Sequence, residues 1–152
     1  MEPSKIFISY GREPEITKFV EWLKSKLEHT GFQVWLDTKD IPAGSPDWRA
    51  EIGKALKSST SLICVITKKY VASEYCKREL YVAHEKRKQI FPLIYDDKWT
   101  SAKGGDGVEY IISPINWTFF RKGTDDFGAS FQQLVSALGG GHGGVSEGMQ
   151  LK

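Results

Sequence analysis

The sequence predicts an α/β domain with a flavodoxin-like fold, in which a five-stranded parallel sheet has helices on both faces. Short apolar runs alternate with segments whose apolar residues recur every three or four positions, the pattern of strands alternating with amphipathic helices. The most apolar run, residues 62–66, is typical of a central strand buried on both faces. The chain of 152 residues has the length of one domain.

The first half of the chain is predicted to form strand, helix, strand and helix. Residues 5–9 and 32–36 are the short apolar runs of the two strands. Between them, one helical stripe consists of Ile16, Phe19, Val20, Leu23 and Leu27. Residues 37–45 form a loop, and Ser45-Pro46 is typical of an N-cap followed by a first-turn proline. The inner face of the second helix then carries Trp48, Ile52, Ala55 and Leu56.

The second half continues the alternation less regularly. A helix is expected from about residue 74 to residue 88. Residues 90–94 are a fourth strand, whose Pro92 cannot donate a ladder hydrogen bond and should lie at an edge or a bulge. Residues 96–112 contain three glycines and are predicted to be a long surface loop, followed by a short strand at residues 113–117. A last helical stripe consists of Phe127, Phe131, Leu134, Val135 and Leu138.

The folded domain is predicted to span residues 1–138. Residues 139–152 hold six glycines and few large apolar groups, which predicts a flexible glycine-rich tail or linker.

The alternation of strands and helices also predicts where a ligand would bind. Right-handed crossovers favour the strand order 2-1-3-4-5, which reverses between the first and third strands. Ligands of such sheets bind outside the carboxyl ends of the strands at that reversal. The segments expected there are residues 9–13, 37–51 and 67–70.

Composition excludes several classes of function. The 21 basic and 19 acidic side chains give a net charge of +2, which does not suit a nucleic-acid binder. The sequence contains no run of about 18 apolar residues, so no membrane partner is predicted. The N-terminal residues lack the apolar core of a signal peptide. Two cysteines do not make a disulfide framework, so we expect a cytoplasmic protein. The histidines and cysteines lack metal-ligand spacing, and no glycine-rich phosphate loop occurs, so no metal or cofactor is expected.

Three polar or aromatic residues remain near the predicted crevice. Trp48 and Glu51 are three residues apart and lie on neighbouring faces of one helix. If no function is assumed, each residue has an ordinary structural interpretation. Trp48 would be a core residue, Glu51 an exposed helix residue paired with Lys54, and Arg12 a solvated cation in a loop.

Five segments resemble, in order and at the right spacing, the Toll/interleukin-1 receptor (TIR) domain. Residues 7–10 (FISY) resemble box 1, and residues 31–37 (GFQVWLD) resemble box 2. Residues 48–59 resemble the helix that follows. Residues 73–80 resemble the family's S-x-W-C-x-x-E-L, with tyrosine in place of tryptophan, and residues 116–120 lie where box 3 would be. The resemblance covers about residues 4–138. The exposed BB loop of the family matches Asp40, Ile41, Pro42, Ala43 and Gly44.

The resemblance implies one of two functions. Some TIR domains cleave NAD+ between nicotinamide and ribose, releasing ADP-ribose or a cyclic form, with NAD+ as substrate and no cofactor. Others are adaptors of innate immune signalling that only self-associate. We favour the enzyme, with Glu51 as the catalytic carboxylate. Glu79 is the second candidate. It ranks below Glu51, because its carboxylate is expected to make a structural hydrogen bond. The substrate-binding residues implied are Ser9, Tyr10, Gly11, Arg12, Asp37 and Trp48. Tyr10 and Trp48 would stack on substrate rings and Arg12 would pair with the pyrophosphate.

The resemblance also implies a partner. BB loops of the family pack head-to-tail against another TIR domain, and such a heterologous contact can extend into an open filament. Residues 40–44 are therefore the predicted self-association loop.

Overall fold

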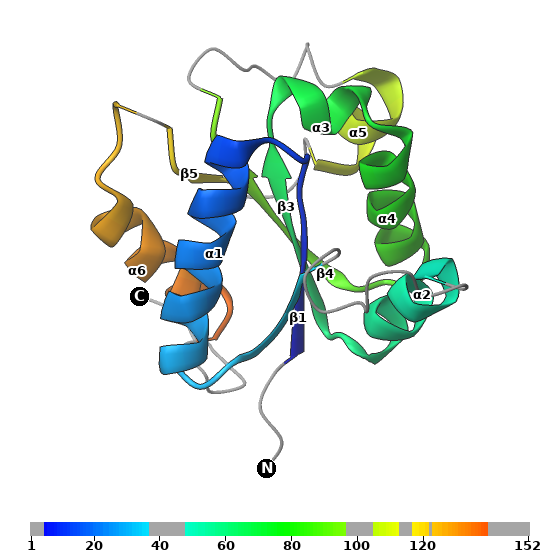
Figure 1. Cartoon of the computed structure of the whole chain (residues 1–152), viewed down its shortest axis with the longest axis horizontal. Helices are drawn as coiled ribbons and strands as arrows, with labels where there is room; N and C mark the ends of the chain where they lie inside the picture. Colours follow the sequence, from blue (N-terminus) through cyan, green and yellow to red (C-terminus); the bar gives the residue numbers. More distant parts are fainter. Residues whose placement is uncertain (1–4, 37–47, 97–104, 113–116, 122, 140–152) are drawn as a thin grey trace.

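The computed structural model describes residues 5–36, 48–96, 105–112, 117–121 and 123–139. For residues 48–52, 75, 105, 106, 109 and 110 it describes the helical backbone and not the side chains. Helices and strands carry the labels of Figure 1.

Five parallel strands form one sheet. They are β1 (Lys5–Ser9), β2 (Gln33–Leu36), β3 (Ser61–Ile66), β4 (Gln89–Ile94) and β5 (Thr118–Phe119). Their order is β2-β1-β3-β4-β5, which confirms the predicted flavodoxin-like topology. In the register of the sheet, Phe7 of β1 lies opposite Trp35 on one side and Leu62 on the other.

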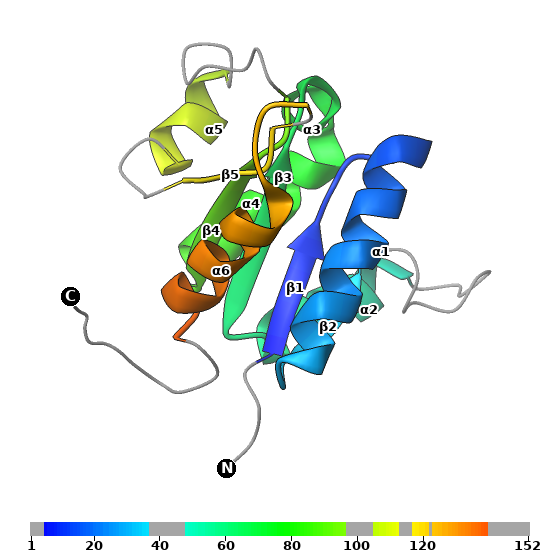
Figure 2. The same ribbon diagram turned by 90° about the vertical axis from the view of Figure 1, so that its left-hand side faces the viewer.

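Helices cover both faces of the sheet, as Figures 1 and 2 show. One face carries α1 (Pro14–His29) and α6 (Phe127–Ala137). The other carries α2 (Trp48–Ser58), α3 (Lys68–Ala72), α4 (Glu74–Glu85) and α5 (Gly105–Ile112).

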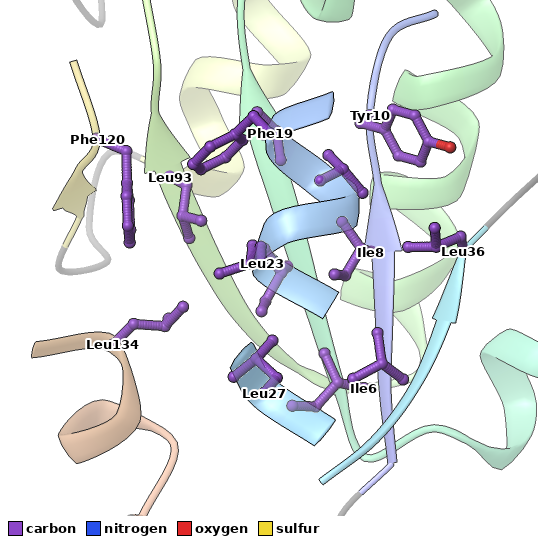
Figure 3. Close-up of a cluster of buried hydrophobic side chains, with 14 of the residues drawn as sticks. Ile6, Ile8, Tyr10, Phe19, Leu23, Leu27, Leu36, Leu93, Phe120 and Leu134 are labelled. Atoms are coloured by element: carbon purple, nitrogen blue, oxygen red, sulfur yellow. The ribbon is translucent and has the colours of Figure 1, made fainter. Parts of the chain in front are cut away.

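Alternate residues of each central strand pack into the two hydrophobic cores on opposite faces of the sheet. Ile6 and Ile8 of β1 pack toward α1, whereas Phe7 between them packs toward the opposite face. Figure 3 shows the first core, where Leu23 and Leu27 of α1 are fully buried among strand residues. Burying one such side chain stabilises the fold by roughly 1.5–3 kcal/mol, so these stripes determine how α1 lies on the sheet.

The predicted surface loop at residues 96–112 is wrong over its last eight residues, which form α5. Val108, Ile111 and Ile112 have helical spacing and are buried on α4's side of the sheet. Gly107 allows the close approach, because a Cβ there would lie 2.1 Å from the hydroxyl oxygen of Tyr81 in α4. The glycine thus serves packing rather than a turn.

The predicted fifth strand at residues 113–117 is displaced. β5 occupies Thr118–Phe119, and residues 113–116 lie outside the described residues. The indole N–H of Trp117 donates to the carbonyl of Ile112 at 2.8 Å, which ties Trp117 to the end of α5. The alternation of a buried Thr118, an exposed Phe119 and a buried Phe120 begins only after it.

The helix expected to reach residue 88 ends at Glu85 instead. Arg87 adopts a left-handed φ of 59°. The N–H of Arg87 donates to His84, and the N–H of Lys88 donates to Ala83. These two bonds are those of a Schellman motif, here with arginine where glycine is usual.

Pro92 does not lie in an edge strand as predicted, because β4 pairs with both β3 and β5, yet its missing N–H is harmless there. Gln89 and Tyr95 donate their N–H groups to the β3 side of the strand. Alternation therefore turns the nitrogen of Pro92 toward β5, but β5 pairs only with Leu93 and Ile94. That side of Pro92 is in effect an edge.

Candidate functional site

The carboxyl ends of the parallel strands meet at one edge of the sheet, where the crevice was predicted. β1 ends at Ser9, β3 at Ile66 and β4 at Ile94. The chain leaves β3 directly into α3, a short helix that the sequence did not predict, and then into α4. This edge therefore combines the end of β1 with the start of two helices.

Three buried polar side chains meet there. The hydroxyl of Ser9 donates to Oε1 of Glu79 at 2.6 Å. The hydroxyls of Ser9 and Tyr70 lie 2.9 Å apart. Tyr70 also donates to the carbonyl of Cys76 at 3.3 Å. Exposed fractions of 0% for Ser9, 0% for Tyr70 and 4% for Glu79 place this cluster away from bulk water.

Helix caps bring two of these residues into place. Thr67 caps α3, because its hydroxyl oxygen accepts the N–H of Tyr70 at 3.1 Å. Ser73 caps α4 in the same way, accepting the N–H of Cys76 at 3.2 Å. With α4 starting there, Glu79 shares the buried face of the helix with Cys76 and Ala83.

The cluster has the electrostatics of a low-dielectric site. Burial raises the pKa of Tyr70 well above its usual value, and the neighbouring Cys64, Cys76 and Glu79 add to that shift. Tyr70 is therefore a neutral hydrogen-bond donor at physiological pH. The 2.6 Å contact from Ser9 to Glu79 has the length of a hydroxyl donating to a carboxylate oxygen.

The predicted substrate-binding residues of the box 1 segment differ in their exposure to solvent. Ser9 and Tyr10 are buried, with exposed fractions of 0% and 2%. Tyr10 belongs to the buried core on the α1 side, which also contains Ile8 and Leu36, so its ring offers no exposed face for the predicted stacking (Figure 3). Gly11 is buried against α3, where a Cβ would lie 3.4 Å from that of Lys69. Arg12 is exposed and remains available for an anionic ligand.

The other predicted site residues lie outside what the structure describes. Trp48 and Glu51 belong to α2, whose backbone confirms a helix there, but their side chains are not described. Asp37 and the self-association loop, residues 40–44, lie in the undescribed segment 37–47. These predictions stay predictions.

Tyr70 is the site residue that sequence reasoning missed. The segment 67–70 was expected at the crevice, yet nothing in it singled out the tyrosine. The available signal was Thr67, three residues earlier, a residue type favoured at helix N-caps.

The described residues hold no group of three or more His, Cys, Asp or Glu side chains able to bind a metal ion. Cys64 lies in the core, where burial raises the pKa of its thiol well above the usual range and makes it a poor nucleophile. Among the helices in the described ranges, none has the length and hydropathy needed to cross a bilayer.

A hollow lies on the opposite face, beside α1 and α6. It measures about 710 Å³ and is lined by Pro14, Glu15, Lys18, Phe19, Trp22, Tyr95 and Phe127. Tyr95 donates to Oε2 of Glu15 at 2.7 Å. Glu15 is exposed, whereas Glu79 of the buried cluster has an exposed fraction of 4%.

Comparison with known proteins gives one family match. The model of a family described as "TIR domain" matches residues 6–135. A curated protein of Brachypodium distachyon named probable 2′ cyclic ADP-D-ribose synthase BdTIR is 30% identical over 94 residues. That match covers 62% of this chain and 42% of the Brachypodium protein, so this chain corresponds to less than half of its relative.

Solved structures share the fold. The TIR domains of the activated Roq1 resistosome superpose with a TM-score of 0.68 at 19% identity, over 89% of this chain and 99% of theirs. The TIR domain of the Toll-related receptor TRR-2 of Hydra magnipapillata gives 0.67 at 19% identity, over 88% and 96%. A 2-deoxyribosyltransferase of Leishmania mexicana gives 0.57 at 18% identity, over 88% and 98%.

Proposed function

This chain belongs to the TIR domain family, and from that membership we propose that it cleaves NAD+ between nicotinamide and ribose. The Brachypodium relative supports this reaction class, since its name is that of a cyclic ADP-ribose synthase. Cyclic ADP-ribose is what remains of NAD+ once nicotinamide has left and the ring has closed. The observation that carries the proposal is the buried carboxylate of Glu79, held by Ser9 at the carboxyl edge of the sheet.

One carboxylate is sufficient for this chemistry. The bond from ribose C1′ to the pyridinium nitrogen breaks, and its electron pair neutralises the leaving nicotinamide, so no acid has to protonate it. A positive charge develops on the ribose, as in other glycoside cleavages. A carboxylate stabilises that charge, and water or a ribose hydroxyl then attacks C1′ and loses a proton. Such electrostatic stabilisation is strongest where water is excluded.

Two glutamates are candidates for this role. Glu51 matches by its position in the helix after the BB loop, as the sequence resemblance implies. Glu79 has the support of geometry, because it lies beside the end of β1 and its orientation is held by a hydrogen bond. We therefore propose Glu79 as the catalytic carboxylate and keep Glu51 as the alternative.

The burial of Glu79 supports activation by self-association. With only 4% of its surface exposed, Glu79 is reached by a substrate only after neighbouring groups move. A second TIR domain that binds residues 40–44 would act on the segment that directly follows β2, the neighbour of β1 in the sheet. The likeness to TIR domains in a resistosome agrees with such assembly. Signalling in innate immunity or cell death is the role we propose for the assembled enzyme.

The test is nicotinamide release from NAD+ by the purified chain and two matched variants. Glu79→Gln and Glu51→Gln both keep size and remove charge. We expect Glu79→Gln to lower turnover by at least about 10²-fold and Glu51→Gln to change it little. The reverse pattern would assign catalysis to Glu51. Thermal unfolding of each variant is the control for folding.

The adaptor function makes the opposite prediction in the same assay. A wild-type chain that assembles in solution but releases no nicotinamide at any protein concentration would exclude the enzyme and favour homotypic signalling.

A further inference from the structure

We propose that Ser9 and Tyr70 are positioning residues, which orient the Glu79 carboxylate through the hydrogen-bond chain Tyr70 to Ser9 to Glu79. This inference rests on the proposed function and assigns Ser9 a role different from the substrate contact that its sequence position suggested.

The directions of the bonds follow from the number of protons available. Ser9 has one hydroxyl proton, and a carboxylate only accepts, so that proton is donated to Glu79. The oxygen of Ser9 can then accept from Tyr70, 2.9 Å away. Burial keeps Tyr70 protonated, because its pKa is raised well above the usual value. Each donor in the chain thus has an acceptor.

The chain joins three elements that are far apart in sequence. Ser9 ends β1, Tyr70 lies in α3 and Glu79 in α4, with separations of 61 residues from Ser9 to Tyr70 and 70 from Ser9 to Glu79. The carbonyl oxygen of Cys76, one turn before Glu79 in α4, lies 3.3 Å from the hydroxyl oxygen of Tyr70. Tyr70 has one proton, so Ser9 at 2.9 Å is its nearer acceptor and this carbonyl is the weaker acceptor of a shared, three-centre bond. Both the carboxylate and the helix that carries it are therefore held relative to the sheet.

Burial makes these contacts effective. Bulk water does not compete for the bonds, because Ser9 and Tyr70 are fully buried. A carboxylate with a fixed orientation loses no free energy to reorganisation when charge develops on the substrate. Removing the hydroxyl of Ser9 would remove one contact that holds the orientation of the carboxylate, and a misplacement of about 1 Å can cost about 10²-fold in rate.

The variants are Ser9→Ala and Tyr70→Phe, each of which removes one hydroxyl. We expect Ser9→Ala to lower kcat roughly 10–100-fold and Tyr70→Phe roughly 3–10-fold, both with little change in KM. Ser130→Ala is the matched control, because Ser130 is also a buried serine but donates to Phe119 in β5. Its kcat per folded molecule should equal that of the wild type.

A double-mutant cycle separates positioning from a purely structural role. If Ser9 acts through the carboxylate, Ser9→Ala should have almost no further effect on kcat in a Glu79→Gln background. A full additional loss in that background, or a wild-type kcat for both Ser9→Ala and Tyr70→Phe, would overturn the inference. An inactive wild-type chain would instead overturn the proposed function, and the positioning role with it. Rates are normalised to the folded fraction, and Tyr70→Phe decides the question if Ser9→Ala does not fold.

Discussion

Glu79 lies on the buried face of α4, one turn from Cys76 and one turn from Ala83. A carboxylate buried among apolar groups destabilises a fold by several kcal/mol unless hydrogen bonds compensate. The hydroxyl of Ser9 supplies such a bond. The sequence predicts a structural hydrogen bond at Glu79, which makes Glu79 a weaker catalytic candidate than Glu51. The structure shows that bond, donated by Ser9 at the end of β1, and the positioning role proposed above adds orientation to its structural role.

Tyr70→Phe should lower the free energy of unfolding at about pH 8 by about 1–3 kcal/mol, because Ser9 and Cys76 lose a buried partner. This loss should shrink above about pH 10. Tyr70 in the unfolded chain ionises near 10.0, whereas burial raises the pKa of folded Tyr70 well above that. The stability that neutral Tyr70 contributes is therefore complete below the unfolded pKa and is lost as pH rises toward the folded one.

Urea unfolding of the wild type and Tyr70→Phe at about pH 8 and about pH 11 measures this difference. A stability gap of the same size at both pH values would show that the pKa of Tyr70 is not raised in the folded chain.

At the scale of elements, local rules explain most boundaries and tertiary contacts explain the exceptions. Thr67 and Ser73 start α3 and α4 with side-chain caps. α4 ends in a Schellman motif whose left-handed position is occupied by Arg87. α5 forms despite its glycines, because three apolar residues bury against the core. Arg87 and Gly107 each give a prediction.

Arg87→Gly should raise the free energy of unfolding by about 0.5–1 kcal/mol. A left-handed φ of 59° strains a residue with a Cβ, and glycine removes that strain. Arg87→Ala is the matched control, since it removes the same exposed side chain but keeps the Cβ, and it should be nearly neutral. Equal effects of the two substitutions in thermal unfolding would mean that the side chain, and not φ, determines the result.

Gly107→Ala should stabilise the chain less with Tyr81 present than with alanine at position 81. In the wild type the new methyl would meet the hydroxyl end of Tyr81, so this exposed ring must move and part of the gain is lost. In a Tyr81→Ala background the same substitution should stabilise α5 by about 0.5–1 kcal/mol, as alanine does in an unobstructed helix. Denaturant unfolding of the four chains tests this, and an equal effect in both backgrounds would show that the contact is not made.

At the scale of the whole molecule, the sheet and its two helical layers bring the ends of β1 and β3 together with α3 and α4. The buried cluster lies on the side of the sheet that also carries α2 and α5. This arrangement leaves the α1 and α6 face, with its aromatic cleft, away from the proposed reaction site.

Specific activity should rise with protein concentration, because a site this buried is expected to open on assembly. Nicotinamide release measured over about a hundredfold range of concentration, together with the mass of the particle in solution, tests this. Substitution of Pro42 or Gly44 in the self-association loop should abolish the rise and leave thermal unfolding unchanged. Activity strictly proportional to concentration would contradict assembly-dependent catalysis.

The sequence by itself determined the topology of this protein and its family. Residues 5–9 and 62–66 could be recognised as strands, and the stripe from Ile16 to Leu27 as a helix, because burial imposes a period that the sequence records directly. Parallel strands joined by right-handed crossovers then allow few arrangements. The crevice at the carboxyl edge followed from that topology.

Only the tertiary structure decided which polar groups meet at that edge. The periodicity of a sequence shows which residues are buried, but not which hydroxyl faces which carboxylate across 70 residues of chain. That pairing depends on strand register and on where the caps start α3 and α4, to within a fraction of a helical turn. For the same reason the sequence could suggest Tyr10 as a ligand contact, whereas the structure buries its ring in the core that also holds Ile8 and Leu36.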